Sequence, residues 1–250
     1  MALRRLFPEP GVVAVEEAVA GLGLAERAVG GRPYVVDNMV ATADGRAAIE
    51  GRAGPIGDPI DRALFLRLRT QVDCVLVGAG TLRAERYGHL VRSEELRAAR
   101  RAEDLDPEPL GCVLTRTMEL PWDTSLWTDP ASRVALYTSA SRNPPPCAAK
   151  VTVHRMADAE LTVERVLRSL HADHDVRSVL CEGGPTLNRE LLAADCLDEL
   201  FLAVEPKLAG GGDEPTIVGG PPLAPPGRLE LVWILEADGA LFLRYRVPRP

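Results

Sequence analysis

The chain has 250 residues, enough for one large domain or two small ones, and its 46% hydrophobic and 26% charged residues are typical of a soluble globular protein. The net charge of −7 argues against a general binder of nucleic acid or anionic membranes. No apolar run reaches the roughly 18 residues of a membrane span. The five cysteines are widely spaced and form no C-x-x-C pair, so we expect no disulfide framework or zinc site and infer a reducing cytoplasm.

The N-terminal segment differs from the rest of the chain. Residues 1–31 are expected to form a peripheral extension, with a moderate helical pattern over residues 16–28 that glycines interrupt. The main domain is then expected over residues 32–250.

The main domain is predicted to open with a strand, a turn and a helix. The strand covers residues 33–42 and ends in Asp44-Gly45, a tight-turn signal, with a short return strand at residues 47–49. Asp58 followed by Pro59 combines a helix-capping acceptor with a proline at the first helical position. A helix is therefore predicted from Asp58 to Arg69.

Short apolar runs recur along the rest of the chain and are typical of parallel strands covered on both faces. They lie at residues 74–77, 112–115, 133–138, 151–154, 176–181 and 200–204. Helical patterns separate several of them. At the C-terminus, two apolar segments flank Asp238-Gly239 and predict an antiparallel hairpin. The fold class is therefore α/β, with a mixed, mostly parallel sheet flanked by helices.

Three loops that follow predicted strands contain small residues and one or two polar groups. They lie at residues 41–45, 78–85 and 182–186. In the third, Gly183 and Gly184 precede Pro185, which suits a first helical turn. The free N–H groups of such a helix start favour a phosphate, although the pattern by itself is equally compatible with an ordinary strand–helix turn.

Charged side chains in and near these loops are suited to binding a small molecule. Asp44, Glu85 and Glu182 could accept hydrogen bonds from amino or hydroxyl groups. Arg69 and Arg92 could clamp a phosphate. The alternatives are a turn or cap role for each carboxylate and a solvated side chain for each arginine. No metal site is expected, because the His171 and His174 pair is of a kind usually solvated at a helix end.

Four segments, in order along the chain, resemble the motifs of one family. They are residues 33–46, 73–82, 182–187 and 205–211. The family is the pyrimidine reductase, or C-terminal reductase domain, of riboflavin biosynthesis, and the resemblance spans residues 32–247. It implies a dihydrofolate-reductase-like fold in a stand-alone form without the family's deaminase domain.

The resemblance also implies an activity. This is NADPH-dependent reduction of a phosphoribosylamino-pyrimidine to its ribitylamino product, with the nicotinamide supplying hydride to the opened sugar. The substrate is 5-amino-6-(5-phosphoribosylamino)uracil or its 2,5-diamino-pyrimidinone counterpart. We expect a homodimer that uses the apolar strand at residues 229–235 as an edge, and no nucleic-acid or membrane partner.

Positions in the motifs imply roles for individual residues. Cofactor contacts are expected from Ala41, Gly78, Gly80, Thr81, Glu85, Thr115, Gly183, Gly184, Pro185, Thr186 and Leu187. Substrate contacts are expected from Asn38, Arg69, Arg92 and Glu182. Asp44 and Glu182 are the candidate catalytic residues, either as the proton donor or by holding a water that is.

The chain departs from the family pattern mainly on the substrate side. Asn38 stands where many fused bacterial reductases have lysine, Ala53 and Pro55 stand for serine and tryptophan, and Glu85 replaces an aspartate. Two alternatives therefore stay open. One is a dihydrofolate or pterin reductase on the same fold, and the other is a non-catalytic NADPH-binding protein.

Overall fold

The strands of the computed structural model, which describes residues 1–249, fall into a parallel and an antiparallel group. The parallel group is β3 (Tyr34–Thr42), β4 (Cys74–Gly78), β5 (Leu110–Thr115), β6 (Arg133–Thr138), β7 (Lys150–Arg155), β8 (Ser178–Cys181) and β9 (Glu199–Glu205). The antiparallel group is β1 (Ala2–Phe7), β2 (Gly11–Ala14), β10 (Glu230–Ala237) and β11 (Ala240–Arg246).

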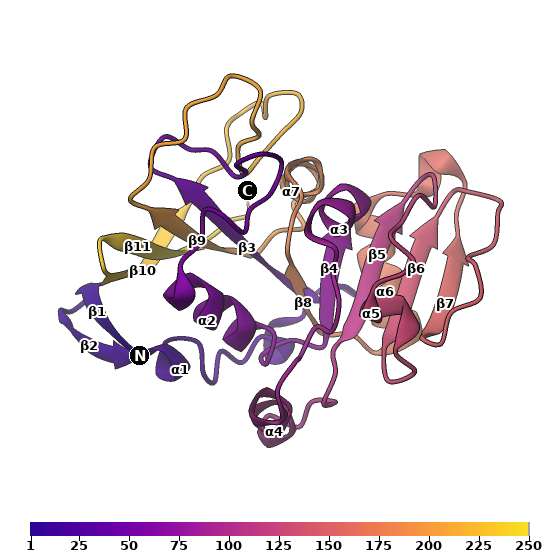
Figure 1. The fold of residues 1–250 in the computed structure, drawn as a ribbon, viewed down its shortest axis with the longest axis horizontal. Helices are drawn as coiled ribbons and strands as arrows, with labels where there is room; N and C mark the ends of the chain where they lie inside the picture. Colours follow the sequence, from indigo (N-terminus) through magenta and orange to yellow (C-terminus); the bar gives the residue numbers. More distant parts are fainter. Residues whose placement is uncertain (250) are drawn as a thin grey trace.

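All these strands join one sheet in the order β2-β1-β10-β11-β9-β3-β8-β4-β5-β6-β7 (Figure 1). The seven parallel strands lie together, so their carboxyl ends share one edge of the sheet. The predicted strands of the main domain are confirmed except at residues 47–49, where the chain makes only an isolated bridge between Ile49 and Arg52.

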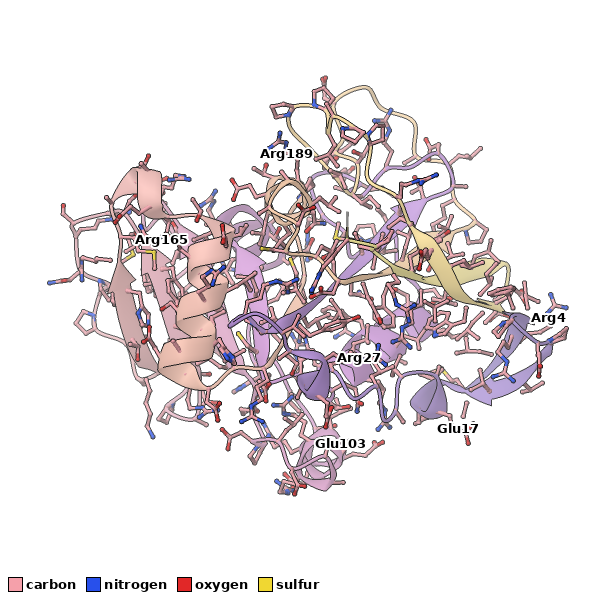
Figure 2. The ribbon with its side chains drawn as sticks, turned by 180° about the vertical axis from the view of Figure 1, so that it is seen from behind. Arg4, Glu17, Arg27, Glu103, Arg165 and Arg189 are labelled. Atoms are coloured by element: carbon pink, nitrogen blue, oxygen red, sulfur yellow. The ribbon has the colours of Figure 1, made fainter. Side chains whose placement is uncertain are left out.

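Helices cover both faces of the sheet. They are α1 (Val15–Ala18), α2 (Pro59–Leu68), α3 (Ala79–Glu85), α4 (Glu94–Ala102), α5 (Ser125–Thr128), α6 (Val163–His174) and α7 (Pro185–Ala193), with 3₁₀ turns at Ala25–Arg27 and Asp158–Glu160. One apolar core packs under α2, α3 and α5, and the other under α6 and α7. Figure 2 shows the second face, where α6, marked by Arg165, lies across the parallel strands. None of the helices within residues 1–249 has the length and apolar character needed to span a membrane.

Helix α2 begins as its sequence predicts. The Asp58 carboxylate accepts hydrogen bonds from the N–H groups of Ile60 (2.8 Å) and Asp61 (2.7 Å), and Pro59 occupies the first position. Ile60, Leu64 and Leu68 face the core. The residues between them lie on the other faces of the helix, where they can face a ligand or solvent.

The N-terminal segment is more closely integrated than expected. β1 pairs with β10, placing Arg4 opposite Glu236, and β2 pairs with β1. Leu3 and Val15 are buried in the core. Because β10 lies between β1 and β11, residues 229–235 do not form the free edge that was expected, and the homodimer itself stays a prediction.

Candidate active site

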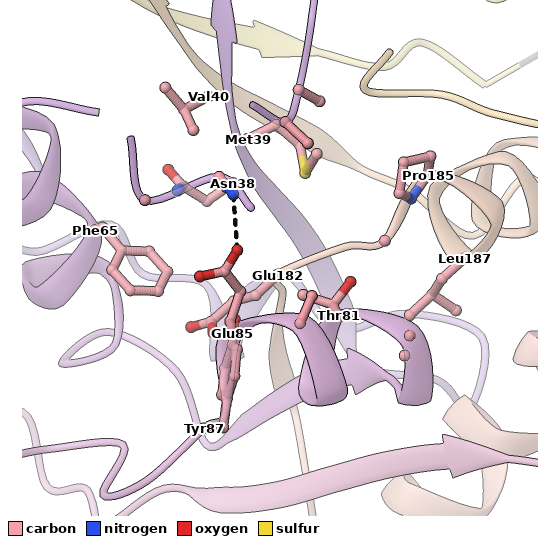
Figure 3. Close-up of a pocket in the computed structure, with 18 of the residues that line it drawn as sticks. Asn38, Met39, Val40, Phe65, Thr81, Glu85, Tyr87, Glu182, Pro185 and Leu187 are labelled. Carbon is pink, nitrogen blue, oxygen red and sulfur yellow. Dashed lines mark hydrogen bonds between the residues drawn. The ribbon is translucent and has the colours of Figure 1, made fainter. Parts of the chain in front are cut away.

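A cavity of about 660 Å³ opens at the carboxyl ends of the parallel strands, where open α/β sheets keep their ligands. Asn38, Met39 and Val40 of β3 line it between two groups of elements (Figure 3). The starts of α3 and α7 line one end, near Thr81 and Leu187. The other end is lined by α2 and by residues 87–92. We call these the glycine end and the arginine end.

Glycines allow unusually close packing at the glycine end. Gly183 has a φ of +79°, and a Cβ added to it would lie 3.1 Å from Met39 Sδ. A Cβ on Gly184 would lie 2.8 Å from Thr81 Oγ1. The Gly78 N–H donates to the Gly183 carbonyl at 3.0 Å. The turn after β8 therefore lies directly against the turn after β4.

The two helices that begin here have no side-chain caps. Gly78 precedes α3 and Gly184 precedes α7, and neither can offer an acceptor to the first N–H groups. Thr186 and Leu187, in the first turn of α7, line the cavity. Free N–H groups and a positive dipole end favour an anion, so these residues fit the pyrophosphate of a dinucleotide cofactor.

The arginine end contains a buried ion pair between Arg69 and Glu182. Arg69 Nε and Nη2 donate to the two oxygens of Glu182 at 2.7 and 2.8 Å, and Nη1 donates to the Leu90 carbonyl at 2.8 Å. The two side chains are 6% and 1% exposed. This bidentate geometry fixes the plane of the Glu182 carboxylate and uses much of the donor capacity of Arg69.

Aromatic rings enclose the pair. The Arg69 guanidinium carbon lies 4.3 Å from the centre of the Phe65 ring and 5.6 Å from that of Tyr87. Burial alone would lower the pKa of Arg69, but the charge and hydrogen bonds of Glu182 outweigh it and raise that pKa. Burial and the nearby Glu182 charge also raise the pKa of Tyr87. Both groups therefore keep their protons throughout the physiological range.

Two further arginines line the cavity at this end. Arg62 and Arg92 are exposed at its mouth, and within residues 1–249 neither side chain forms an ion pair. Burial and repulsion by Arg62 and Arg69 lower the pKa of Arg92. Cations held together without a counter-charge are a suitable site for a substrate phosphate. Arg62 was not among the predicted substrate-binding residues, but it lines the cavity together with Arg92.

A loop closes over the cavity between the two ends. The Glu85 carboxylate accepts a hydrogen bond from the Ala53 N–H at 2.7 Å, drawn as the dashed line in Figure 3. The Lys207 ammonium donates to the carbonyls of Pro55 and Ile56. Glu85, expected to contact the cofactor, thus also fastens the loop that carries the two altered positions, Ala53 and Pro55.

The structure does not bring Asp44 to the cavity. Its carboxylate is exposed and accepts hydrogen bonds from Thr42 Oγ1 (2.5 Å) and from the N–H groups of Ala209 (3.1 Å) and Gly210 (2.7 Å). The Thr42 hydroxyl and then these N–H groups lower the pKa of Asp44 to about 2. A carboxylate of that kind holds no proton near neutral pH, so this placement offers no support for the expected catalytic role.

Most of the other expected residues do line the cavity. These are Asn38, Arg69, Gly78, Gly80, Thr81, Glu85, Arg92, Thr115, Glu182, Gly184, Pro185, Thr186 and Leu187. Ala41 and Gly183 do not line it, because Ala41 is buried in β3 and Gly183 packs against Met39. Sequence reasoning missed the cavity face of α2, formed by Asp61, Arg62 and Phe65. Phe65 lies four residues before Arg69, and Asp61 and Arg62 lie four and three residues before Phe65. This helical spacing is the signal that could have found them.

The fold and the cavity together define a class of protein. It is an α/β protein with a cavity suited to a nucleotide and a second small molecule at the carboxyl edge of one sheet.

Comparison with known proteins gives the family. The RibD C-terminal domain matches residues 33–239, and the chain belongs to this family. It is 30% identical over 217 residues to 2,5-diamino-6-ribosylamino-4(3H)-pyrimidinone 5′-phosphate reductase of Archaeoglobus fulgidus, covering 86% of this chain and 99% of the relative. The corresponding reductase of Methanothermobacter thermautotrophicus is 29% identical over 76% of this chain and 85% of its own length.

A solved structure agrees in fold. A pyrimidine reductase-like protein from Corynebacterium diphtheriae superposes with a TM-score of 0.77 at 22% identity, covering 95% of this chain and all of that one. The predicted fold class, an α/β fold with a mixed, mostly parallel sheet flanked by helices and a C-terminal antiparallel hairpin, is confirmed.

Proposed function

We propose that the chain catalyses the NADPH-dependent reduction of 2,5-diamino-6-ribosylamino-4(3H)-pyrimidinone 5′-phosphate to its ribitylamino product, a step of riboflavin biosynthesis. The archaeal relatives carry the name of this reductase. The observation that carries the proposal is the division of one cavity between two uncapped helix starts and a pair of arginines that have no ion-pair partner among residues 1–249. That division suits two phosphate-bearing ligands bound end to end.

Each end of the cavity then has a definite task. The bound cofactor supplies a hydride, and the residues at the starts of α3 and α7 hold its phosphates. Arg62 and Arg92 hold the substrate phosphate at the opposite end. The Glu182 carboxylate has lone pairs left after it has accepted from Arg69, and it would accept hydrogen bonds from substrate amino or hydroxyl groups.

The choice of NADPH over NADH is supported by Arg116. It follows Thr115 at the end of β5 and lines the cavity. Its guanidinium donates to Asp158 Oδ1 at 2.6 Å and to the Asp158 carbonyl at 2.9 Å, which leaves donors for another acceptor. A cation at this end of the cavity would favour a cofactor that carries an additional phosphate.

The test is cofactor oxidation by the purified protein with three substrates. These are the 2,5-diamino-pyrimidinone phosphate, its deaminated uracil counterpart, and dihydrofolate. We expect the first to be reduced with the highest kcat/KM. Preference for the uracil compound would reassign the substrate within the same reaction. Preference for dihydrofolate would establish the pterin reductase alternative, and tight NADPH binding without turnover would establish the non-catalytic one.

Two further expectations about the chain stay predictions. The expected homodimer can be tested by measuring the oligomeric state with sedimentation equilibrium or light scattering. The edge of β10 is not available as its contact, because β1 pairs with it. A cytoplasmic location fits the five cysteines, all of them free thiols in the structure.

A further inference from the structure

One carboxyl group in the cavity stands out because its oxygens have no partner among the described residues and it borders an apolar space. Asp61 lies in the first turn of α2 and lines the cavity beside Asn38 of β3. Within residues 1–249, its carboxyl group has no hydrogen-bond donor and no ion-pair partner, although its backbone N–H donates to Asp58 Oδ1. It contrasts with Glu182, whose two oxygens both accept from Arg69.

Packing partly shields this carboxyl group from bulk water. Asp61 and Asn38 also line a second cavity of about 20 Å³, whose other lining residues are all apolar. A Cβ at Gly57 would overlap Asp61 Oδ2, so the absence of a side chain at Gly57 makes room for the carboxyl group. Asp61 therefore forms part of the wall between an apolar space and the larger cavity, where an ionised carboxylate is poorly solvated.

The charged groups around Asp61 also favour its protonated form. Asp58 lies one turn earlier on α2, and the buried Glu205 ends β9. Both are acidic, and the Glu205 carboxylate is held to the Asp58 N–H at 3.2 Å. The cation that opposes them is Lys207, whose ammonium already donates to the Pro55 and Ile56 carbonyls. Burial first, and then the charges of Glu205 and Asp58, raise the pKa of Asp61 to about 7.

We propose that Asp61 is the catalytic acid that protonates the substrate during reduction. The role rests on the proposed function. When the opened sugar is joined to the pyrimidine through a C=N bond, its carbon gains the hydride and the π pair moves to nitrogen. The nitrogen takes the Asp61 proton, so a C–H and an N–H bond form while one C=N π bond is lost. The Asp61 carboxylate then regains a proton from water, and the cofactor is left oxidised.

Asp61 suits this task better than the other carboxyl groups considered. Both oxygens of Glu182 already accept hydrogen bonds from the buried Arg69 guanidinium, which orients them as acceptors. Asp44 lies outside the cavity lining and is stabilised as a carboxylate by three donors. An acid whose pKa lies near the working pH is both protonated often enough and able to release its proton.

The test compares pH profiles of Asp61→Asn and the wild type, using NADPH and the pyrimidine phosphate. Wild-type kcat should fall tenfold per pH unit above about pH 7, because the donor must be protonated. Asp61→Asn keeps the shape but holds no transferable proton. At pH 6 the kcat of this variant should be lower than that of the wild type by about 100-fold or more. The fall in kcat at alkaline pH should be absent, and the affinity for NADPH should be unchanged.

Glu205→Gln provides a positioning control. Removing the neighbouring negative charge should lower the pKa of Asp61 and move the alkaline fall in kcat to lower pH, while a merely structural role would leave the fall in place. Carboxyl ¹³C NMR of wild type against Asp61→Asn gives a readout independent of turnover. A pKa of about 4 for Asp61, the value of an ordinary aspartate, would overturn the assignment.

The two possible failures are distinguishable. If the wild type reduces the pyrimidine phosphate and Asp61→Asn does so with an equal kcat and the same pH profile, the acid is another group and only this role is overturned. If the wild type reduces none of the three substrates, the proposed function is overturned and this role with it.

Discussion

The two ends of the cavity present different chemical groups to a ligand: backbone groups at the glycine end and charged side chains at the arginine end. At the glycine end, the backbone does most of the binding, since Gly78 and Gly184 leave two helix starts uncapped and close together. At the arginine end, long charged side chains form the surface. Arg69 and Glu182 form a buried ion pair, and Arg62 and Arg92 form none with the part of the chain that the structure describes. A backbone site depends on the absence of side chains, whereas a side-chain site depends on the pairing of charges. Substitutions at the two ends should therefore have different effects on stability and on ligand binding.

The largest effect is expected from breaking the buried pair. Arg69→Met leaves the Glu182 carboxylate buried and unpaired, which should lower the free energy of unfolding by about 3–5 kcal/mol. Urea unfolding measures this loss. The double variant Arg69→Met/Glu182→Met should regain most of the stability without regaining turnover. A single-variant loss below about 1 kcal/mol would mean that the pair is solvated.

The glycine end should respond to a single methyl group. Gly183→Ala places a Cβ at a φ of +79° and 3.1 Å from Met39 Sδ, so we expect a loss of about 1–2 kcal/mol in stability. The shifted turn should also raise the Kd for NADPH about tenfold, measured by cofactor fluorescence. The matched control is Gly212→Ala, because a Cβ there meets no atom within 4 Å. Equal behaviour of the two variants would contradict the role of close packing.

The unpaired arginines should affect phosphorylated substrates selectively. Arg62→Ala and Arg92→Ala should each raise KM for the pyrimidine phosphate about tenfold, corresponding to about 1.4 kcal/mol, and should leave KM for the dephosphorylated compound unchanged. Arg165→Ala is the control. Arg165 lies on α6, does not line the cavity, and pairs with Glu160. The same increase with both compounds would argue against a phosphate site.

The smallest expected effect is on cofactor choice. Arg116→Ala should raise KM for NADPH several-fold and leave KM for NADH almost unchanged, since an exposed charge contributes about 1 kcal/mol or less. Steady-state kinetics with both cofactors measure the ratio. If both KM values rise together, Arg116 does not distinguish them, and its pairing with Asp158 serves the loop alone.

The same contrast explains how far the sequence can be interpreted. Glycine turns after apolar strands are local patterns, so the helix starts at Gly78 and Gly184 could be predicted from neighbouring residues. The Arg69–Glu182 pair joins positions 113 residues apart, and no local pattern indicates which acid an arginine will meet. Asp44 was expected at the site because of the motif to which it belongs. Its Asp-Gly sequence instead indicates a turn, and its carboxylate does accept hydrogen bonds from Thr42 and Gly210 rather than face the cavity.

The N-terminal strands could not be predicted for a similar reason. β1 finds its partner in β10, at the other end of the chain, while its own sequence carries only a weak alternating pattern. Helix α2 shows the intermediate case. Its capping by Asp58 and Pro59 was predicted correctly, but its cavity face, with Asp61 and Arg62, was not, because the elements opposite that face come from distant parts of the chain.

The pairing of β1 with β10 has a consequence for how the protein is made. Residues 2–7 leave the ribosome before all the parallel strands, and their partner strand, residues 230–237, leaves it after them. β1 must therefore wait, with its edge unsatisfied, until β10 has been synthesised. We expect the parallel part of the sheet to be assembled cotranslationally before this edge is closed, so that β1 joins the sheet after the strands that follow it in the chain.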